Sequence, residues 1–400
     1  MPICSFKFRR TGVSGILGLV LVFLVTGSTG CGRREKAAPE QIEPILKVSW
    51  RSYVRHYISP AGRVVIPERS GESISEAQAY ALLRAVWAND PATFARVYAW
   101  TWRHLSRQGE KGDALLAWRW GKDKDGAWRV LDWNTATDGD LDYALALILA
   151  ARRGWRPTGE LPDYTGEARR VLEAIGALET VRLPAGELLL TAGNWHESQP
   201  PYLLNPSYFS PAAYRIFGEL QPQAGWERLR DSTYELLTRL SRGLGTQMGV
   251  GLFPDWCRVD ARGQPSPGPG QDTHFGWEAV RLPWRLALDG LWFQDQRAIR
   301  LLKQRFLPFF HQEWQAHGRL AAIYSYEGKP LVNYESPVLY AGVLAAALAA
   351  GEQNFARQMA ERILHFYQIE RERAYFLNPD NYYANNWAWL GLALYVGWVK

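Results

Sequence analysis

The sequence predicts an all-α fold in which helices joined by long loops form a toroid. Helical periodicity begins near residue 50 and dominates the rest of the chain; in SEAQAYALLRAVWAND, for example, Ala79, Leu82, Leu83 and Val86 share one face. The segment DGDLDYALALILAARRG is apolar nearly all round, which is typical of a helix buried on every side. Strand patterns are few, and no shift in composition divides the chain into separate domains.

The N-terminal residues 1–30 predict an export signal. KFRR is a cationic segment, GVSGILGLVLVFLVTG is an apolar core, and small residues precede Cys31 in STGC. We expect a signal peptide or a lipoprotein signal with lipidation at Cys31; an uncleaved anchor and plain secretion are the alternatives. All of these place the protein outside the cytoplasm, in the periplasm or beyond the cell. A lipid or an anchor would also tether it to the membrane.

The following residues 31–48 are polar and charged and predict a tether, so we expect the folded domain to span 49–400. A strand is expected in GELLLTAG at 186–193, and the Pro/Gly-rich stretch at 263–272 predicts a loop between two helical regions. The expected helices lie at 75–90, 91–108, 138–154, 164–177, 210–219, 225–244, 277–291, 295–316, 335–350, 353–370 and 384–398.

The composition favours a wet aromatic groove and excludes other classes of site. The 400 residues include 19 Trp and 19 Tyr, whose rings stack well on the C–H faces of sugars. The net charge of +6 falls to about 6 − 3 = +3 without Lys7, Arg9 and Arg10, and no basic stripe indicates nucleic-acid binding. Three cysteines and seven histidines show neither a disulfide framework nor metal-ligand spacing, so we expect no metal and no cofactor.

The stretch SISEAQAY places Glu76 at the start of an apolar helix. Ser75 and Gln78 have the spacing of a capping box, in which each side chain satisfies a free backbone N–H. An acid in the first helical turn is favoured by the helix dipole, so a purely structural role explains Glu76 by itself. The alternative is a catalytic acid, and only the other acidic motifs distinguish the two.

A cluster of three acids, Asp138, Asp140 and Asp142, opens the next strongly apolar helix. Thr137 or Asp138 would cap that helix, but three carboxylates exceed what capping needs. Clustered carboxylates raise one another's pKa values, a cost found mainly at functional sites. A calcium loop of the EF-hand type is excluded because the required Gly and closing Glu are missing.

A third acid, Glu278, lies near the start of another helix, three residues before Arg281. The pair has the spacing of an ordinary ion pair on a helix surface. Glycoside hydrolysis, however, requires two carboxyl groups flanking the scissile bond, one as proton donor and one as base or nucleophile. The acidic helix starts and the abundant tryptophans together favour that chemistry.

Several segments resemble glycoside hydrolase family 8, the inverting enzymes with an (α/α)6 barrel that act on cellulose and other β-linked glycans. SISEAQAYALLRAVWANDPATF is similar to the segment that carries the family's proton donor, and ATDGD resembles its A-[ST]-D-[AG]-D signature. AWRWGK is similar to the lead-in of endoglucanases from bacterial cellulose synthesis. NPSYFSPAAYRIF and NYYANNWAWLGLAL match further segments, in the right order along residues 50–400.

The resemblance implies roles for individual residues. Glu76 takes the general-acid position, Asp138 the position that binds the distorted sugar, and Glu278 the position of the base. The family often has Asp at that last position, and the additional methylene of Glu278 displaces the carboxylate. Either the local backbone compensates for this displacement, or another segment supplies the base. The residues expected to bind substrate are Trp118, Trp120, Trp133, Tyr208, Arg281 and Asp140.

The function implied is an inverting endo-β-1,4-glucanase that hydrolyses cellulose-like β-glucan. Its expected partners are a β-linked polysaccharide, the cellulose synthase machinery, and the membrane through the N-terminal lipid or anchor. Alternatives are a family-8 hydrolase for xylan, mixed-linkage glucan or chitosan, and a catalytically impaired glycan-binding scaffold that assists cellulose synthesis. The changed residue at position 278 is the best support for the scaffold.

Overall fold

The computed structural model describes residues 38–268 and 273–400, which belong to one compact unit, Lys36–Lys400. The expected export signal and Cys31 lie outside the described residues. Within them, no helix combines the length and apolarity that a bilayer span requires.

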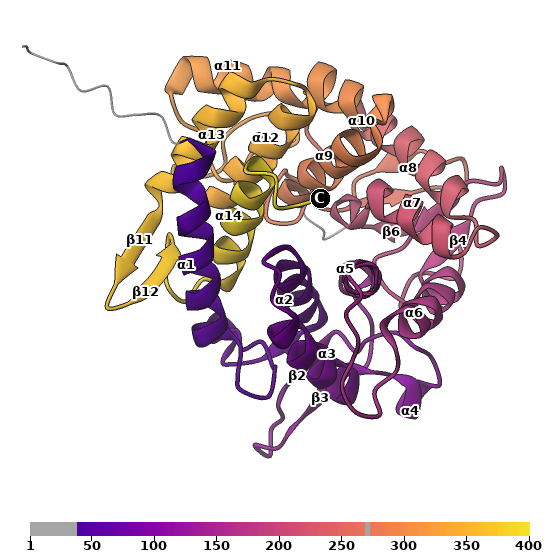
Figure 1. Cartoon of the computed structure of the whole chain (residues 1–400). Coiled ribbons are helices and arrows are strands. Elements are labelled where there is room, and N and C mark those ends of the chain that lie inside the picture. The colour runs from indigo at the N-terminus through magenta and orange to yellow at the C-terminus, as the bar shows by residue number, and fades with distance from the viewer. Residues whose placement is uncertain (1–37, 269–272) are drawn as a thin grey trace, which may run out of the picture. The chain divides into compact units, whose positions relative to one another are not determined.

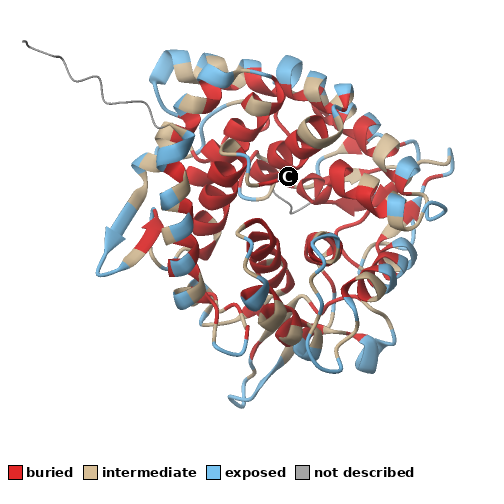
Figure 2. Ribbon diagram, in the orientation of Figure 1, coloured by how far each residue is buried: buried red, intermediate tan, exposed pale blue. Residues whose placement is uncertain are grey.

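An inner ring of helices forms the centre of this unit (Figure 1). Each inner helix contacts the next, and α14 returns to contact α2, which closes the ring. These helices are buried almost completely, as the red ribbons of Figure 2 show. The described part of the chain contributes six of them: α2 (Ser75–Trp87), α5 (Thr137–Arg152), α7 (Pro211–Leu220), α9 (Leu282–Phe293), α12 (Pro337–Ala349) and α14 (Tyr382–Tyr395).

An outer layer of helices packs around the ring and alternates with it along the chain. Each outer helix has one apolar face turned inward and one polar face turned to solvent. The structure thereby confirms the (α/α)6 barrel. The outer helices are α1 (Pro39–Tyr57), α3 (Pro91–Leu105), α6 (Tyr164–Leu178), α8 (Trp226–Leu240), α10 (Gln296–Leu301), which continues through a π turn (Leu302–Phe306) into α11 (Leu307–His317), and α13 (Gln353–His365).

The alternation gathers the N-termini of the inner helices at one end of the barrel, because each outer helix runs back in the opposite direction. Helices α1 and α14 show this directly. The Tyr57 hydroxyl at the end of α1 donates to the Pro379 carbonyl just before α14, at 2.6 Å. The Trp389 indole further along α14 donates to the Leu46 carbonyl, nearer the start of α1, at 3.1 Å.

Short antiparallel strands lie in the loops between the helices. The strand expected at 186–193 is confirmed as β5 (Leu188–Leu190), which pairs with β4 (Thr180–Arg182). A three-stranded sheet of β1 (Ser73–Ile74), β2 (Arg119–Lys122) and β3 (Trp128–Asp132) leads directly into α2. The other strands are β6 (Tyr202–Leu204), β7 (Gly243–Leu244), β8 (Gln247–Met248), β9 (Cys257–Val259), β10 (Pro265–Ser266), β11 (Tyr367–Glu370) and β12 (Arg373–Phe376).

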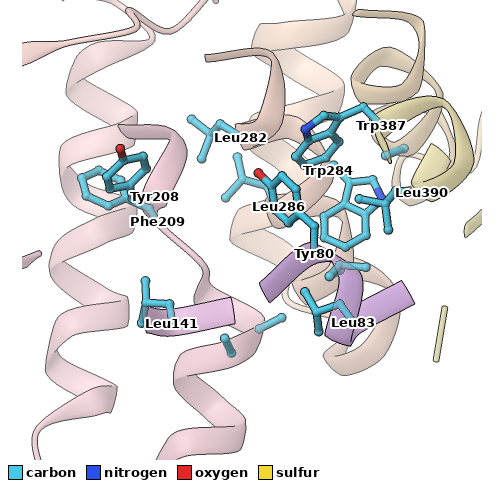
Figure 3. Close-up of a cluster of buried hydrophobic side chains, with 14 of the residues drawn as sticks. Tyr80, Leu83, Leu141, Tyr208, Phe209, Leu282, Trp284, Leu286, Trp387 and Leu390 are labelled. Carbon is cyan, nitrogen blue, oxygen red and sulfur yellow. The ribbon is translucent and has the colours of Figure 1, made fainter. Parts of the chain in front are cut away.

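The core contains much of the tryptophan that the composition assigned to a groove. Trp284 and Trp387 meet edge to face at 5.6 Å between ring centroids, and Tyr80 meets Trp387 in the same way (Figure 3). Such pairs add about 0.5–1.5 kcal/mol each to the burial of their area. The buried tryptophans are Trp50, Trp87, Trp100, Trp226, Trp284, Trp387 and Trp389.

Three local expectations are wrong. Residues 39–48 are not a tether but the first part of α1, because Ile42 and Leu46 are fully buried against the barrel. The helix expected at 353–370 ends at His365, and the chain turns into β11. The capping box at the start of α2 does not form. Ser75 already lies inside the helix, and the Gln78 side chain accepts from the Val64 N–H and donates to Thr101 instead.

Candidate active site

Glu76 and Asp138 are each the second residue of an inner helix, α2 and α5, and so lie at the same end of the barrel. Gly139 allows the two helix starts to approach, since a Cβ at this position would overlap the Ser75 side chain. The Glu76 side chain is 14% exposed and the Asp138 side chain only 2%. Glu76 is therefore reachable from solvent, whereas Asp138 lies beneath it.

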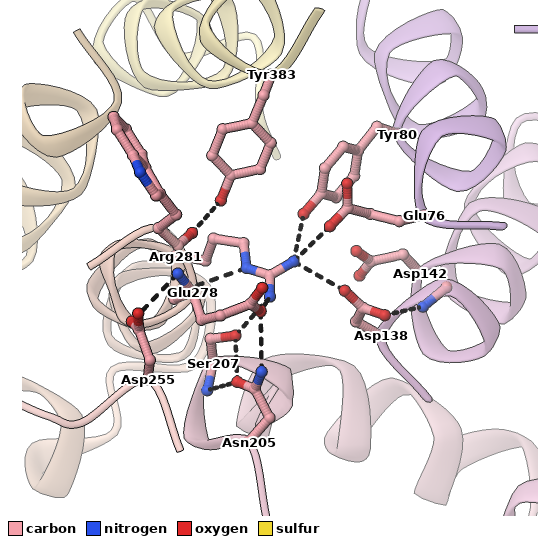
Figure 4. Close-up of polar contacts among 12 residues, drawn as sticks. Glu76, Tyr80, Asp138, Asp142, Asn205, Ser207, Asp255, Glu278, Arg281 and Tyr383 are labelled. Carbon is pink, nitrogen blue, oxygen red and sulfur yellow. Dashed lines mark hydrogen bonds and ion pairs between the residues drawn. The ribbon is translucent and has the colours of Figure 1, made fainter. Parts of the chain in front are cut away.

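Arg281 connects the carboxylates of this end (Figure 4). It ends the 3-10 turn Ala279–Arg281 before α9, and its side chain is 1% exposed. One guanidinium nitrogen, Nη1, donates to Glu76 at 2.5 Å and to Asp138 at 2.8 Å. The other, Nη2, donates to Ser207 at 2.8 Å and to Glu278. A single buried cation therefore holds three acids in one cluster.

The same geometry repeats one turn along both helices. Asp142 and Arg285, each four residues beyond Asp138 and Arg281, form a buried bidentate pair with distances of 2.7 and 2.8 Å. Because residues four apart share a helix face, the two pairs fix how α5 sits against α9. The position of Arg281 in the cluster is thus built into the packing of the ring.

The pKa of Glu76 is raised well above that of a free glutamate. Burial raises the pKa of its carboxyl to about 7, and nearby Asp138 adds to the rise, while Arg281 opposes it. The Tyr382 hydroxyl, from the first residue of α14, donates to the other Glu76 oxygen and also lowers the pKa. A carboxyl that titrates near pH 7 is suited to donate a proton.

We predict that Tyr382→Phe shifts the alkaline limb of kcat/KM to higher pH. Loss of the donated hydrogen bond destabilises the ionised form of Glu76, so its pKa rises above about 7 and the proton is retained for longer. A pH–rate profile on a soluble β-glucan measures the shift. Tyr395→Phe, at the other end of α14, is the matched control and should leave the limb in place. An unchanged limb in Tyr382→Phe would contradict the assignment.

Glu278 lies across Arg281 from Glu76 and is 33% exposed. The Asn205 amide donates to its carboxylate at 2.8 Å, and burial together with Asp138 raises its pKa. Asp255 fixes the backbone beneath it by accepting the N–H groups of Glu278 at 3.2 Å and Ala279 at 2.7 Å. The side chain is therefore positioned by two loops and remains open to water.

Three of the expected aromatic residues lie close to this end of the barrel. Tyr208 is buried with the Arg281 guanidinium 5.3 Å from its ring centroid. Trp118 is half-buried, and its carbonyl accepts the Ser75 N–H at the start of α2. Trp133 is half-buried and precedes α5 by a few residues, with the Lys111 ammonium 5.8 Å from its ring.

Asp140 and Trp120 are not brought to the cluster. Asp140 is fully buried, accepts the Leu116 N–H at 2.8 Å and lies against Glu179, so it supports the loop before β2 rather than contacting substrate. The Trp120 ring stacks on Trp128 at 4.8 Å and meets the outer helix α3 through Trp100. The full burial of Asp140 argues against a contact with substrate, whereas substrate binding by the half-buried Trp120 stays a prediction.

The sequence reasoning missed several residues of the site. Tyr382 and Tyr383 open α14 just as Glu76 opens α2, and the Tyr383 hydroxyl donates to the Trp277 carbonyl beside Glu278. The signal for them was the pair of tyrosines directly before an apolar helix. The remaining missed residues, far apart in sequence, are Tyr80 on α2, Asn205 and Ser207 at the 3-10 turn Pro206–Tyr208, and Asp255. Among residues 38–268 and 273–400, no group of three His, Cys, Asp or Glu side chains could hold a metal ion.

Comparisons with known proteins identify the family and the fold of this chain. Residues 24–378 match the model of glycosyl hydrolases family 8. Endoglucanase A of Acetivibrio thermocellus is 28% identical over 326 residues, which cover 80% of this chain and 64% of that protein. An endoglucanase of Xanthomonas axonopodis pv. citri is 35% identical over 228 residues, 56% of each chain. The matched parts thus span between half and two thirds of these relatives.

A solved structure of similar fold is the endo-1,4-D-glucanase of Vibrio fischeri ES114. It superposes with a TM-score of 0.69 at 24% identity and covers 87% of this chain and 94% of that one. The match to the family model covers most of the residues that build the ring and includes Glu76, Asp138 and Glu278. The chain therefore belongs to glycosyl hydrolase family 8.

Proposed function

We propose that the chain is an inverting endo-β-1,4-glucanase acting on cellulose-like β-glucan, with Glu76 as general acid and Glu278 as general base. One observation carries the proposal: Arg281 holds two solvent-accessible carboxyl groups on opposite sides, and one of them has a pKa of about 7. The relatives named endoglucanases support a glucan as the substrate class.

The acid step follows from the surroundings of Glu76. The neutral carboxyl donates its proton to the glycosidic oxygen, and the bond from that oxygen to the anomeric carbon breaks. The carboxylate that remains is stabilised by Arg281 at 2.5 Å and by the Tyr382 hydroxyl. Both contacts are stronger to the ionised form, so they favour the transition state over the ground state.

The base step uses Glu278 in its ionised form, which the Asn205 amide and Arg281 stabilise. The carboxylate accepts a proton from a water molecule while the water oxygen attacks the anomeric carbon from the face opposite the leaving oxygen. The configuration at that carbon is inverted. Both carboxyl groups then exchange protons with solvent, which restores the starting state.

The first test is a set of reducing-sugar assays on carboxymethyl-cellulose, xylan, mixed-linkage glucan and chitosan. We expect the highest rate on carboxymethyl-cellulose, and proton NMR of the first product should show the α-anomer from the β-linked substrate. A retained β-anomer would contradict the inverting mechanism. Glycan binding with no hydrolysis of any substrate would indicate the scaffold instead.

We also propose that the protein is exported and is held to the membrane through lipid on Cys31 or through the apolar segment before it. Support comes from the cationic and apolar segments and from STGC at the start of the sequence. An endoglucanase at that place would meet cellulose chains as a synthase releases them.

A further inference from the structure

A cavity lies at the end of the barrel opposite the catalytic cluster. Its volume is about 600 Å³, a common size for a ligand site. Trp87 is the last residue of α2, Arg153 follows α5, and Trp398 and Lys400 follow α14. The same three helices carry Glu76, Asp138 and Tyr382 at their starts. With 1.5 Å of rise per residue, the cavity lies about 20 Å from the cluster.

The cavity gathers four cations, Lys47, Arg51, Arg153 and Lys400, and none of its lining residues is an acid. All four are exposed, and within residues 38–268 and 273–400 none of them forms an ion pair. Asp90 lies beside Arg51 in a neighbouring pocket and accepts the Trp50 indole N–H at 3.1 Å and the Thr93 N–H at 3.0 Å. The lining of the cavity itself therefore carries four cations and no acidic side chain.

Helix dipoles account for only part of this arrangement. Arg153 and Lys400 follow the C-termini of inner helices, where the dipole favours cations. Lys47 and Arg51 lie in the middle of α1, one turn apart, and have no such reason to face the cavity. The half-buried Trp398 and the cations together form the combination that is typical of proteins at a membrane–water interface.

The chain enters the barrel at this same end. Helix α1 begins at Pro39, and Lys47 lies eight residues, or about 12 Å, further along it. Cys31 precedes Pro39 by eight residues, which reach at most about 27 Å when extended. A lipid on Cys31 would therefore keep this end of the barrel, and not the catalytic end, close to the bilayer.

We propose that the cavity, together with Lys47 and Arg51 on α1, binds headgroup phosphates of an anionic lipid bilayer. The proposal rests on the membrane attachment proposed above for its geometry, and on charge complementarity for its chemistry. Docking at this face orients the barrel so that Glu76 and Glu278 point away from the membrane, toward polysaccharide outside it.

Lysine footprinting on the full chain tests this docking. The chain is bound to vesicles of phosphatidylcholine alone or of phosphatidylcholine with phosphatidylglycerol, and acetylation of each lysine is followed by mass spectrometry. Lys47 and Lys400 should react several-fold more slowly on the anionic vesicles, because a lysine held against headgroup phosphates is less accessible to the reagent. Lys122 at the catalytic end and Lys303 on the outer wall should react equally on both.

Charge reversal supplies the matched variants. Arg51→Glu with Arg153→Glu keeps both lysine reporters and should abolish their protection, whereas Arg300→Glu with Arg305→Glu, on the outer wall, should preserve it. Equal reactivity of Lys47 on the two vesicle types overturns the proposal. Equal protection by millimolar inorganic phosphate without vesicles also overturns it, in favour of a soluble anion. If the protein does not float with neutral vesicles, only the N-terminal attachment is refuted. The acetylation of Lys47 and Lys400 on anionic vesicles is a separate measurement and tests the cavity by itself.

Discussion

Glu76→Gln is expected to lower kcat on β-glucan by about 10²–10⁴-fold, the usual contribution of a positioned general acid. The amide has the shape of the carboxyl but carries no proton that it can transfer at neutral pH. The fold should persist, because the amide oxygen can still accept from Arg281, and only the hydrogen bond from the Tyr382 hydroxyl is lost, at a cost of about 0.5–1.5 kcal/mol. Reducing-sugar assays and a thermal unfolding scan on the same sample give both results.

A substrate whose leaving group departs without a proton shows whether Glu76 is the proton donor or only supports the structure of the site. Cellobiosyl fluoride and dinitrophenyl cellobioside carry good leaving groups, so Glu76→Gln should hydrolyse them at a rate much closer to that of the unchanged protein. Glu68→Gln is the matched control. The Glu68 carboxylate accepts the backbone N–H of the same Tyr382 at 3.1 Å but lies outside the cluster. An equal loss on activated and ordinary substrates would show that Glu76 is not the proton donor.

Arg281→Met should have the largest effect on stability. It leaves Glu76, Asp138 and Glu278 together without their cation, and breaking a buried ion pair from one side costs about 3–5 kcal/mol. The free energy of unfolding in urea should fall by about that amount, and hydrolysis should be lost. Arg281→Lys should also fail to restore the rate, because one ammonium cannot replace the two nitrogens that separate the acids.

The pH profile of Arg281→Lys distinguishes its electrostatic role from a purely structural one. Because Arg281 lowers the pKa of Glu76, a weaker contact should move the alkaline limb of any residual activity to higher pH. Arg285→Met breaks the neighbouring buried pair with Asp142 and should destabilise the fold to a similar extent. Its residual activity should keep the limb near pH 7. The same shift in both variants would indicate general loosening of the barrel.

The sequence predicted the helices well because both kinds of helix leave a clear pattern. Inner helices are apolar nearly all round, and outer helices are apolar on one face only. Periodicity shows which face of a helix is apolar but not which helix packs there, so the sixfold ring followed from family resemblance and not from the pattern itself. Glu76, Asp138, Glu278 and Arg281 could be singled out because acids and cations beside apolar helix starts are conspicuous, but their roles followed from the family resemblance and stay predictions. Tyr382 and Asn205 could not be singled out, since only the closed ring brings them near residue 76 or 278.

The wrong expectation for Asp140 was avoidable from helix geometry alone. Each helical residue turns by about 100°, so Asp140 points about 200° away from Asp138, whereas Asp142 returns to nearly the same face. The structure agrees, with Asp140 against Glu179 and Asp142 on Arg285. The capping box, by contrast, failed for a reason outside the octapeptide. The Ser75 N–H is already satisfied by the Trp118 carbonyl from a loop more than forty residues away.

The closure of the ring by α14 has a consequence for when the enzyme becomes active. Helix α2 meets its neighbour α14 only after about 300 further residues have been synthesised, which takes about 15–60 s at ordinary translation rates. Until then Glu76 lacks Tyr382, and the apolar side of α2 lacks a partner. Until α14 has been synthesised the ring cannot close, so the nascent chain lacks a complete catalytic cluster.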